Sequence, residues 1–551
     1  MDDAIDPVTL EVLWSRLRGL PREMGSHLSR TAYSAVIKYA RDFSTATFTA
    51  DGRMLAQGVY APGHLGSMPF MVRKLFEHFP RETWEPGDVV LTNDPRINSG
   101  HLPDLFVFAP VFYEGDLRGF CVIGGHHLDI GGAGTASYTM HVTDLYAEGI
   151  QVPPVKLYDA GEPDEKVFDI VTANSREPEK LRGDLEAQIG ATQVGQDLFC
   201  EILEEHGVAT AERYFEEILD RSEERMRTAI DDVPDGVYEF EDRMDGFDEP
   251  LPVHATITVD GTELEVDFAG TADQVPGRAI NAVSQYTFAY TMLGLKSVID
   301  PDSPQTQGAI EPVTVTAPEG SLLNAQLPVP VGSRQLVADR VISTVVGALN
   351  EAVPGETPAP GGQPHRQMFK FTHPETGELQ VLFDGHYGGA GARPERDGNH
   401  AVAGTNNLQN TPVEAIESEY PMRINTYRLR PDSSGAGRYR GGAGTVREYE
   451  FDVRTEVQLV NERFKFGPFG VQGAGDGRPG AAILNPDGEA RDLHSKEQFQ
   501  ADAGDVLRVF TPGGGGYGEP NRRPMDAVRA DVRDGVLSPE VAERRYDVEL
   551  D

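Results

Sequence analysis

Histidine and aspartate side chains are concentrated in one stretch of the sequence, residues 88–132. His101 and Asp104 stand three residues apart in a loop marked by glycine and proline, and the pair His126-His127 follows them. Imidazole and carboxylate ligands suit Zn, Mn or Fe, and three protein ligands that leave a position open suit a catalytic metal. These residue types therefore indicate a site for one divalent metal ion. The alternative is a loop cap followed by two surface imidazoles, because short motifs have a high false-positive rate.

Two apolar runs are predicted to be the strands that position these candidate ligands. They are Leu105–Phe112 and Leu117–Ile123, each bounded by turn residues. A two-residue hairpin loop at Glu114-Gly115 would join them and pair Tyr113 with Asp116. The sequence therefore predicts an antiparallel hairpin.

The register of this hairpin decides which side chains meet. Continued without interruption from the turn, it places Asp104 opposite Gly125 and Pro103 opposite His126. His101 and Asp104, at the start of one strand, then meet the histidines at the end of the other. We expect two or three imidazoles and one carboxylate at this end of the hairpin.

Three further polar residues are candidate catalytic groups beside these ligands: Asp94, His127 and Asp129. Each has a titratable side chain that could move protons, and the aspartates could also accept the second N–H of a ligating imidazole. The alternative for the two aspartates is turn chemistry, in which the side chain bonds to its own backbone.

The spacing NDPxxxxGHLPD (93–104) followed by HHxDIGG (126–132) resembles the hydantoinase B/oxoprolinase family. Other stretches with the look of that family cover nearly the whole chain. They are RDFSTATFTADGRMLAQ (41–57), PGHLGSMP (62–69), EGIQVPPVKLY (148–158), DFAGTADQVPGRAINA (267–282), APEGSLLNA (317–325), NTPVEAIESEYP (410–421) and TPGGGGYGEP (511–520). The family includes the B subunit of N-methylhydantoinase and the matching part of 5-oxoprolinase. The alpha subunits of acetone and acetophenone carboxylases are its relatives.

The resemblance implies a ligand set as well as a family. His101, Asp104 and His126 fall on the positions that hold manganese in the acetone carboxylase alpha subunit. Ser99-Gly100 stands where Gly-Thr is more usual, a departure that leaves the three ligands in place. The resemblance thus selects three of the residues that the hairpin is expected to gather.

The family pairs such a B-type chain with an A-type subunit of the actin/hexokinase-like ATPase class. The resemblance implies that the A-type subunit uses ATP to phosphorylate a carbonyl oxygen, and that the B-type chain completes the reaction. It therefore implies an ATP-dependent cyclic amide hydrolase that opens hydantoin, N-methylhydantoin or 5-oxoproline. Two alternatives stay open: an alpha-type subunit of a ketone carboxylase, and a non-catalytic partner of the ATPase subunit.

The formal net charge is −39, with 88 acidic residues against 49 basic ones, of which nine are lysine. An acidic surface with little lysine resembles that of a halophilic protein, which charge repulsion and hydration keep soluble. The hydrophobic content of 39% argues against a disordered acidic chain. Nucleic-acid binding is not expected, because it requires a basic footprint.

The two cysteines, Cys121 and Cys200, exclude a disulfide framework and fit a reducing cytosol. We interpret both as small buried apolar side chains rather than nucleophiles. No apolar run approaches the ~18 residues of a membrane span, and no N-terminal apolar signal region is present. A cytoplasmic location without membrane association is therefore expected.

The pattern of elements predicts an α+β fold, a large multi-segment arrangement of antiparallel sheets and long helices. We expect an N-terminal α+β domain with the metal-site hairpin (1–235), a central α/β region with Gly/Pro-rich loops (236–425), and a C-terminal β-rich domain with terminal helices (426–551). A helix is expected around Pro69–Glu77. The glycine-rich segment 385–398 could line a pocket or serve as a turn-rich connector.

Several catalytic motifs are missing from the sequence. There is no P-loop, no GxSxG nucleophile elbow and no dinucleotide-binding GxGxxG between a strand and a helix. The isolated chain is therefore not expected to hydrolyse ATP, which agrees with a division of labour between two subunits.

Overall fold

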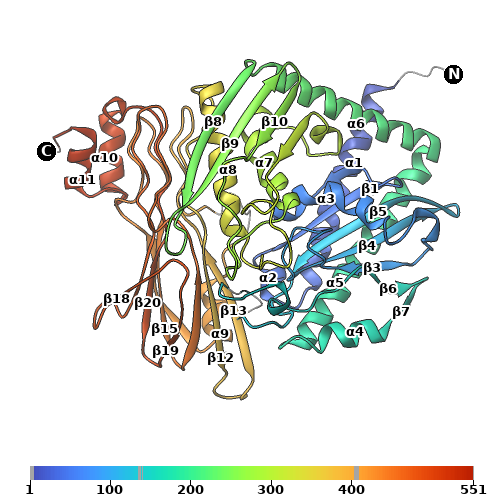
Figure 1. Ribbon diagram of the computed structural model, residues 1–551, viewed down its shortest axis with the longest axis horizontal. Helices are drawn as coiled ribbons and strands as arrows, with labels where there is room; N and C mark the ends of the chain where they lie inside the picture. Colours follow the sequence, from blue (N-terminus) through green and yellow to red (C-terminus); the bar gives the residue numbers. More distant parts are fainter. Residues whose placement is uncertain (1–4, 135–137, 139, 403–408, 550–551) are drawn as a thin grey trace.

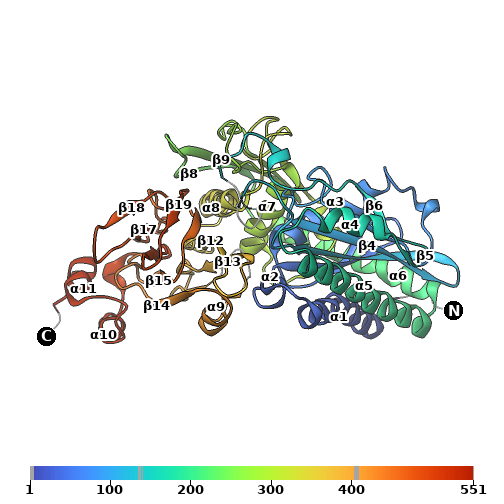
Figure 2. The same cartoon turned by 90° about the horizontal axis from the view of Figure 1, so that it is seen from below.

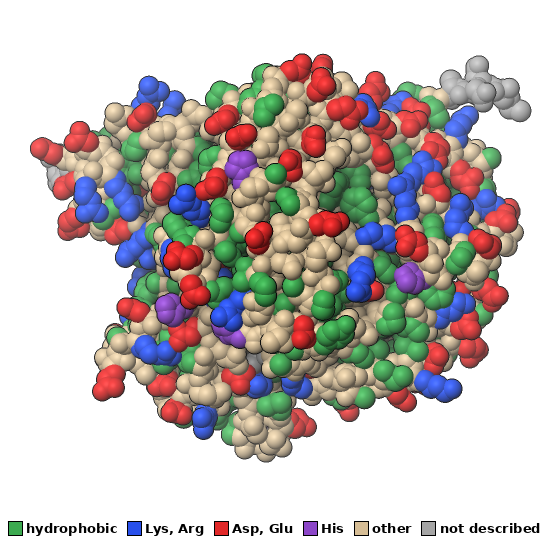
Figure 3. All heavy atoms as spheres, viewed as in Figure 1, with side chains coloured by type: hydrophobic (Ala, Val, Ile, Leu, Met, Phe, Trp, Pro, Cys, Tyr) green, Lys and Arg blue, Asp and Glu red, His purple; other side chains and the backbone are tan. Residues whose placement is uncertain are grey.

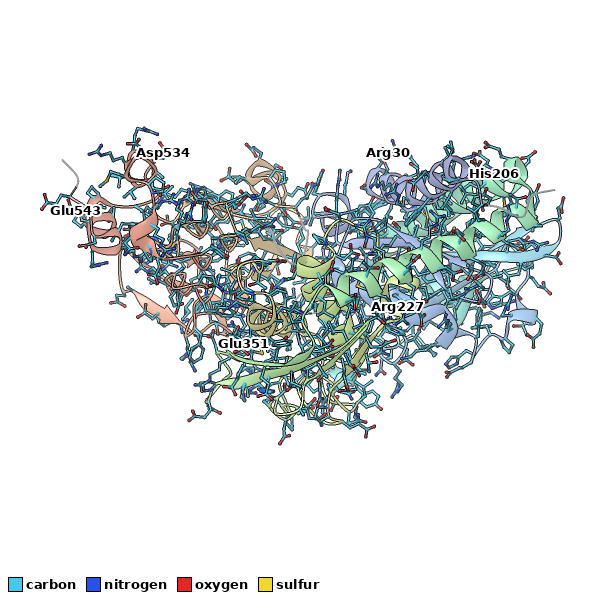
Figure 4. The ribbon with its side chains drawn as sticks, turned by 90° about the horizontal axis from the view of Figure 1, so that it is seen from above. Arg30, His206, Arg227, Glu351, Asp534 and Glu543 are labelled. Carbon is cyan, nitrogen blue, oxygen red and sulfur yellow. The ribbon has the colours of Figure 1, made fainter. Side chains whose placement is uncertain are left out.

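The computed structural model describes residues 5–134, 138, 140–402 and 409–549, and these form an α+β fold. Mostly antiparallel sheets lie beside long helices, as expected from the sequence. The N-terminal elements form one end of the molecule and the C-terminal strands and helices the other (Figure 1). Figure 4 shows this separation, with Arg30 and His206 far from Asp534 and Glu543.

The predicted ligands lie on a seven-stranded sheet with the strand order β2-β1-β5-β4-β3-β6-β7. Its strands are β1 (Phe43–Thr49), β2 (Met54–Gln57), β3 (Val89–Thr92), β4 (Asp104–Tyr113), β5 (Asp116–His126), β6 (Val155–Asp159) and β7 (Glu162–Pro163). Helices α1 (Pro7–Thr31) and α5 (Pro178–His206) pack on one face, and α3 (Pro62–Leu75) packs on the other. Val107 packs in the hydrophobic core between the sheet and helices α1 and α5, and Phe106 packs in the core between the sheet and α3. The two residues lie on different faces because successive side chains on a strand point to opposite sides.

Strands β4 and β5 form the predicted hairpin. Glu114-Gly115 is its turn, with φ values of 54° and 88°, and the turn pairs its flanking residues as expected. A β-bulge at Arg118 then inserts one extra residue into β5. The expected pairing of Asp104 with Gly125 is therefore wrong by one residue, and Asp104 lies directly opposite His126.

Helix α3 begins earlier than the predicted helix Pro69–Glu77, and this places His64 in its first turn. Its glycines suggest a loop, but they serve packing against α7 (Ser284–Ile299). A Cβ atom added at Gly66 would lie 2.5 Å from the Cα of Ala289 in α7. Close helix packing therefore explains a glycine inside this helix.

The described residues form three further sheets. The first, in the order β11-β10-β9-β8, contains β8 (Gly236–Met244), β9 (Leu251–Asp260), β10 (Glu263–Asp267) and β11 (Val313–Thr316). The second, β13-β12-β16-β19, contains β12 (His365–Thr372), β13 (Leu379–His386), β16 (Thr455–Val460) and β19 (Gln498–Ala501). The third, β14-β15-β20-β17-β18, contains β14 (Met422–Leu429), β15 (Thr445–Phe451), β17 (Ala481–Leu484), β18 (Arg491–Leu493) and β20 (Val506–Phe510).

The remaining helices connect and cover these sheets. Helix α8 (Gln335–Ala352) packs against α7 and against β8 and β9. The others are α2 (Ala35–Lys38), α4 (Glu165–Thr172), α6 (Val208–Asp231), α9 (Val413–Glu419), α10 (Met525–Arg533) and α11 (Pro539–Tyr546). Figure 2 shows α10 and α11 at the C-terminal end and α7 and α8 near the middle of the molecule.

The expected division into three domains stays a prediction. Strand β12 pairs with β16, so one sheet joins residues on both sides of the expected boundary at 425/426. Acidic side chains are spread over the face seen in Figure 3, as the net charge suggests. Within the described ranges, no helix combines the length and apolar character needed to cross a membrane.

Candidate metal centre

The Asp104 carboxylate is the centre of the candidate site and is fully buried at the first position of β4. Its Oδ1 lies 2.6 Å from His101 Nε2 and 3.1 Å from His126 Nδ1. Its Oδ2 lies 2.9 Å from His64 Nε2 and 2.6 Å from Arg334 Nη2. One oxygen thus faces the predicted imidazoles, and the other is held by two groups that sequence reasoning missed.

Charge keeps the Asp104 carboxylate ionised. Burial raises the pKa of Asp104, but its electrostatic interactions with His101, His64 and Arg334 and the hydrogen bond with His101 outweigh burial and hold the pKa well below the ordinary value. Burial and the Arg334 charge lower the pKa of His101 to about 3. The site therefore combines an anionic carboxylate with a neutral imidazole, the protonation states that metal ligands require.

Hydrogen bonding determines the tautomer of His101. Its Nδ1 lies 3.0 Å from the carbonyl oxygen of Gly332, which can only accept, so Nδ1 carries the proton. The lone pair of Nε2 then faces Asp104 Oδ1 at 2.6 Å and His126 Nδ1 at 3.2 Å. Lone pairs that converge in this way repel one another unless a cation lies between them, so this donor set fits a metal ion.

The ligand atoms of His101, Asp104 and His126 all lie within 4.8 Å of one another. In the described part of the chain this is the one group of three or more His, Cys, Asp or Glu side chains with such spacing. Two nitrogens and one carboxylate oxygen suit Mn, Zn or Fe. The geometry agrees with the predicted ligand set, and metal binding itself stays a prediction.

Gly100 and the start of α8 hold the side chains around Asp104 in position. Gly100 has a φ of 109°, and a Cβ atom there would lie 2.8 Å from Val283 and 3.1 Å from Arg334. Arg334 precedes the first residue of α8, and its Nη2 also lies 3.0 Å from Ser99 Oγ. Ser99 Oγ donates to Asp104 Oδ2 at 2.5 Å. The loop before β4 and the start of α8 therefore hold one another in register.

The cluster opens into a small pocket with a cavity volume of about 40 Å³. Besides the cluster itself and its two Asp104 partners, the lining residues are Asp42, Ala61, Gly63, Tyr138, Tyr286, Tyr290, Gln335 and Arg366. The polar groups His64 and Asp42 stand in two of the family-like stretches, PGHLGSMP and RDFSTATFTADGRMLAQ. The other polar residues of the pocket gave no signal in the sequence, because they lie outside these two stretches and outside residues 88–132.

The three predicted catalytic groups have partners outside this pocket. His127 points to the other face of the sheet, where its Nε2 lies 2.9 Å from Gln188 Oε1. Asp129 pairs with Arg176 at 2.5 Å, and Asp94 accepts from Arg96. Their catalytic role stays a prediction, and the geometry does not favour it.

The segment 385–398 lies outside the pocket as well, because none of its residues contributes to the lining. Its glycines instead approach neighbouring backbone closely. A Cβ atom at Gly389 would lie 1.9 Å from the carbonyl oxygen of Gly442, and one at Gly391 would lie 1.7 Å from that of Ala359. The structure therefore favours the connector interpretation of this segment.

With this fold and site, the chain belongs to the hydantoinase B/oxoprolinase family, whose sequence model matches residues 6–520. A protein of Pseudomonas sp. (strain NS671), provisionally named as the B subunit of a D-/L-hydantoinase, is 34% identical over 99% of this chain and 95% of its own length. The beta subunit of caprolactamase from Pseudomonas jessenii is 33% identical over 100% of this chain and 97% of its own. The family predicted from the sequence is confirmed.

Solved structures show the same fold. The ATP-dependent caprolactamase of Pseudomonas jessenii matches with a TM-score of 0.91 and 32% identity, covering 100% of this chain and 97% of that one. A nucleotide-free acetone carboxylase structure matches with a TM-score of 0.87 over 98% of this chain and 79% of the other, at 16% identity. The second likeness concerns the fold alone.

Proposed function

We propose that this chain is the B-type subunit of an ATP-dependent cyclic amide hydrolase that acts through one divalent metal ion. The observation that carries the proposal is the convergence of His101 Nε2, His126 Nδ1 and Asp104 Oδ1 in a buried pocket. When bound, the metal would lower the pKa of a water molecule or polarise a carbonyl group. Names of the relatives, hydantoinase and caprolactamase, support cyclic amides as the substrate class.

The residues of the chain would position the ligands and the substrate. His64 and Arg334 bind Asp104 Oδ2, which turns Oδ1 toward the two ligating imidazoles. Tyr286 and Tyr290 line the pocket, and burial raises the pKa of both hydroxyl groups, so they stay protonated at neutral pH. Protonated phenols are hydrogen-bond donors suited to an oxygen that gains negative charge as the ring opens.

An A-type ATPase subunit is the proposed partner. The chain lacks every nucleotide-binding motif considered above, whereas a similar solved structure is an ATP-dependent caprolactamase. The names of both relatives also describe them as subunits. In this proposal ATP is used by the partner, and ring opening is completed in the pocket of this chain.

The test uses the chain co-purified with a candidate A-type ATPase subunit. Ring opening and ATP use are measured with hydantoins, 5-oxoproline, lactams and ketones, for wild type and His101→Ala, together with metal content. We expect ATP-dependent opening of a cyclic amide, which His101→Ala abolishes along with bound metal. The exposed His78 provides the matched control, because His78→Ala should change neither property. Activity on ketones alone, or equal metal content in His101→Ala and wild type, would overturn the proposal.

A further inference from the structure

One buried arginine in the pocket has a guanidinium group that the described residues leave without a partner. Arg366, the second residue of β12, is 3% exposed and lines the pocket together with the Asp104 cluster. Its backbone N–H donates to Asn461 Oδ1 at 2.8 Å, but the described residues supply no hydrogen bond or carboxylate to its guanidinium. Nη1 in particular is buried and unpaired. A buried charge without a partner is unfavourable by several kcal/mol, on the order that desolvation implies.

Other buried arginines show what this position lacks. Pairs with a carboxylate include Arg334 with Asp104, Arg340 with Asp242 and Glu462, Arg447 with Asp384, and Arg463 with Asp242. Arg430 has no such pair among the described residues and donates instead to the carbonyl oxygens of Pro479 and Thr511. The fold therefore supplies a carboxylate or a carbonyl acceptor to each of these buried guanidinium groups. At the Arg366 guanidinium it supplies no carboxylate within 4.0 Å and no hydrogen-bond acceptor among the residues that the structure describes, and the side chain faces a pocket instead.

A second polar group points to the same ligand. Gln335, the first residue of α8, is 5% exposed and lines the pocket. Both its Nε2 and its Oε1 are buried without a hydrogen-bond partner in the described part of the chain. The N-terminal end of an 18-residue helix also carries partial positive charge. Arg366 and Gln335 come from separate elements and leave donors unused in one cavity.

The other charged groups of the pocket do not satisfy Arg366. Asp104 is bound by Arg334 and by three imidazoles. Asp42 also lines the pocket, but among the described residues it forms no ion pair with the Arg366 guanidinium. Among the described residues the pocket therefore has an unpaired guanidinium and unused hydrogen-bond donors, the combination that binds anionic oxygen.

We propose that Arg366 and Gln335 form a receptor for an anionic oxygen group of the substrate, either a carboxylate or a phosphoryl group. The planar fork of arginine matches both groups with two parallel hydrogen bonds, and the Gln335 amide adds a third donor. This assigns a binding role to two residues outside the metal ligands. It rests on the proposed function only in treating the pocket as the substrate site.

The test measures anion binding without turnover. Calorimetry with chelator-treated protein uses inorganic phosphate as the phosphoryl probe and 5-oxoproline as the carboxylate probe, because metal removal excludes binding to the ion itself. We expect at least one probe to bind, Arg366→Gln to weaken it tenfold or more, and Gln335→Leu to weaken it less. Arg366→Lys should be intermediate, since it keeps the charge and loses the fork. The exposed Arg454 is the matched control, and Arg454→Gln should bind like wild type.

The outcomes separate the two sources of the anion. Phosphate binding that depends on Arg366 supports a phosphoryl group, and 5-oxoproline binding that depends on it supports a carboxylate. No binding of either probe to wild type, or equal affinity in wild type and Arg366→Gln, overturns the proposal. Arg366→Lys provides the measurement if Arg366→Gln does not fold, as judged by circular dichroism. Because no ring opening is measured, failure of the proposed hydrolase activity leaves this result unaffected.

Discussion

A buried glutamate behind the metal centre should make the stability of the protein strongly pH-dependent. Glu148 is fully buried, and its Oε1 accepts the N–H of Gly332 at 2.7 Å. Its Oε2 has no partner among the residues described. Burial raises the pKa of Glu148 from 4.5 to about 8, against the opposing effect of the backbone N–H groups of Gly332 and Val331. Gly332 in turn accepts from His101, so this glutamate supports a predicted metal ligand.

The direction of this pH dependence follows from the pH at which the folded and the unfolded protein each release the Glu148 proton. The folded protein keeps this proton up to about pH 8, whereas the unfolded chain releases it near pH 4.5. The stabilisation is therefore fully present below pH 4.5 and is lost as the pH rises toward 8. At about 1.4 kcal/mol for each pH unit over which only the unfolded chain is ionised, the loss is on the order of 3–4 kcal/mol between pH 5 and pH 8. Glu148→Gln keeps the acceptor for Gly332 and removes the titration.

Urea unfolding of wild type and Glu148→Gln at pH 5 and pH 8 measures this effect. Comparison of the two proteins at each pH removes the contribution of distant titrating groups. We expect the variant to gain about 3–4 kcal/mol relative to wild type between pH 5 and pH 8. Glu11→Gln, at an exposed position of α1, should show no such gain. Parallel pH profiles for wild type and Glu148→Gln would refute the reasoning, since they would mean that the carboxylate is ionised throughout.

Three other predictions concern charge and thiols. Asp104→Asn should lower the free energy of unfolding of chelator-treated protein by about 3–5 kcal/mol, because it leaves the buried Arg334 without its counter-charge; unchanged urea midpoints would contradict this. Cys121 should not react with a thiol reagent until the protein unfolds, because burial raises its pKa, whereas the half-buried Cys200 should react slowly in the native state. The melting temperature should rise between low and molar KCl, because the net charge of −39 is self-repelling and the Debye length at 1 M is ~3 Å; a constant value would argue against a halophilic surface.

The local geometry of the site was accessible from the sequence, since short-range rules govern it. The apolar runs, the Glu114-Gly115 turn and the gathering of His101, Asp104 and the histidine pair 126–127 at one end of the hairpin follow from strand periodicity and turn chemistry. The family resemblance selected His126 from that pair. The bulge at Arg118 was not accessible, because nothing in the letters around it marks an inserted residue. It moved the register by one position and placed Asp104 and His126 directly opposite one another.

The walls of the pocket could not be predicted in the same way. Arg334 and Asp104 are 230 residues apart, and their contact depends on where the tertiary fold places the start of α8 relative to β4. In the sequence, Arg366 cannot be distinguished from other charged strand residues, and such residues are expected on the surface. His127 shows the opposite error: adjacency in sequence suggested a shared role, whereas strand alternation turns it toward Gln188.

The spread of the pocket over the chain has a consequence for folding. Its walls need the first sheet, the start of α8 and β12, so contacts between residues more than 200 positions apart must form before it exists. Such long-range contacts form late, and intermediates are common in chains of this size. A ligand that binds only the completed pocket stabilises the whole native chain by mass action, in proportion to the logarithm of its concentration. Occupancy of the pocket is therefore also a readout of whether the two ends of the molecule have assembled.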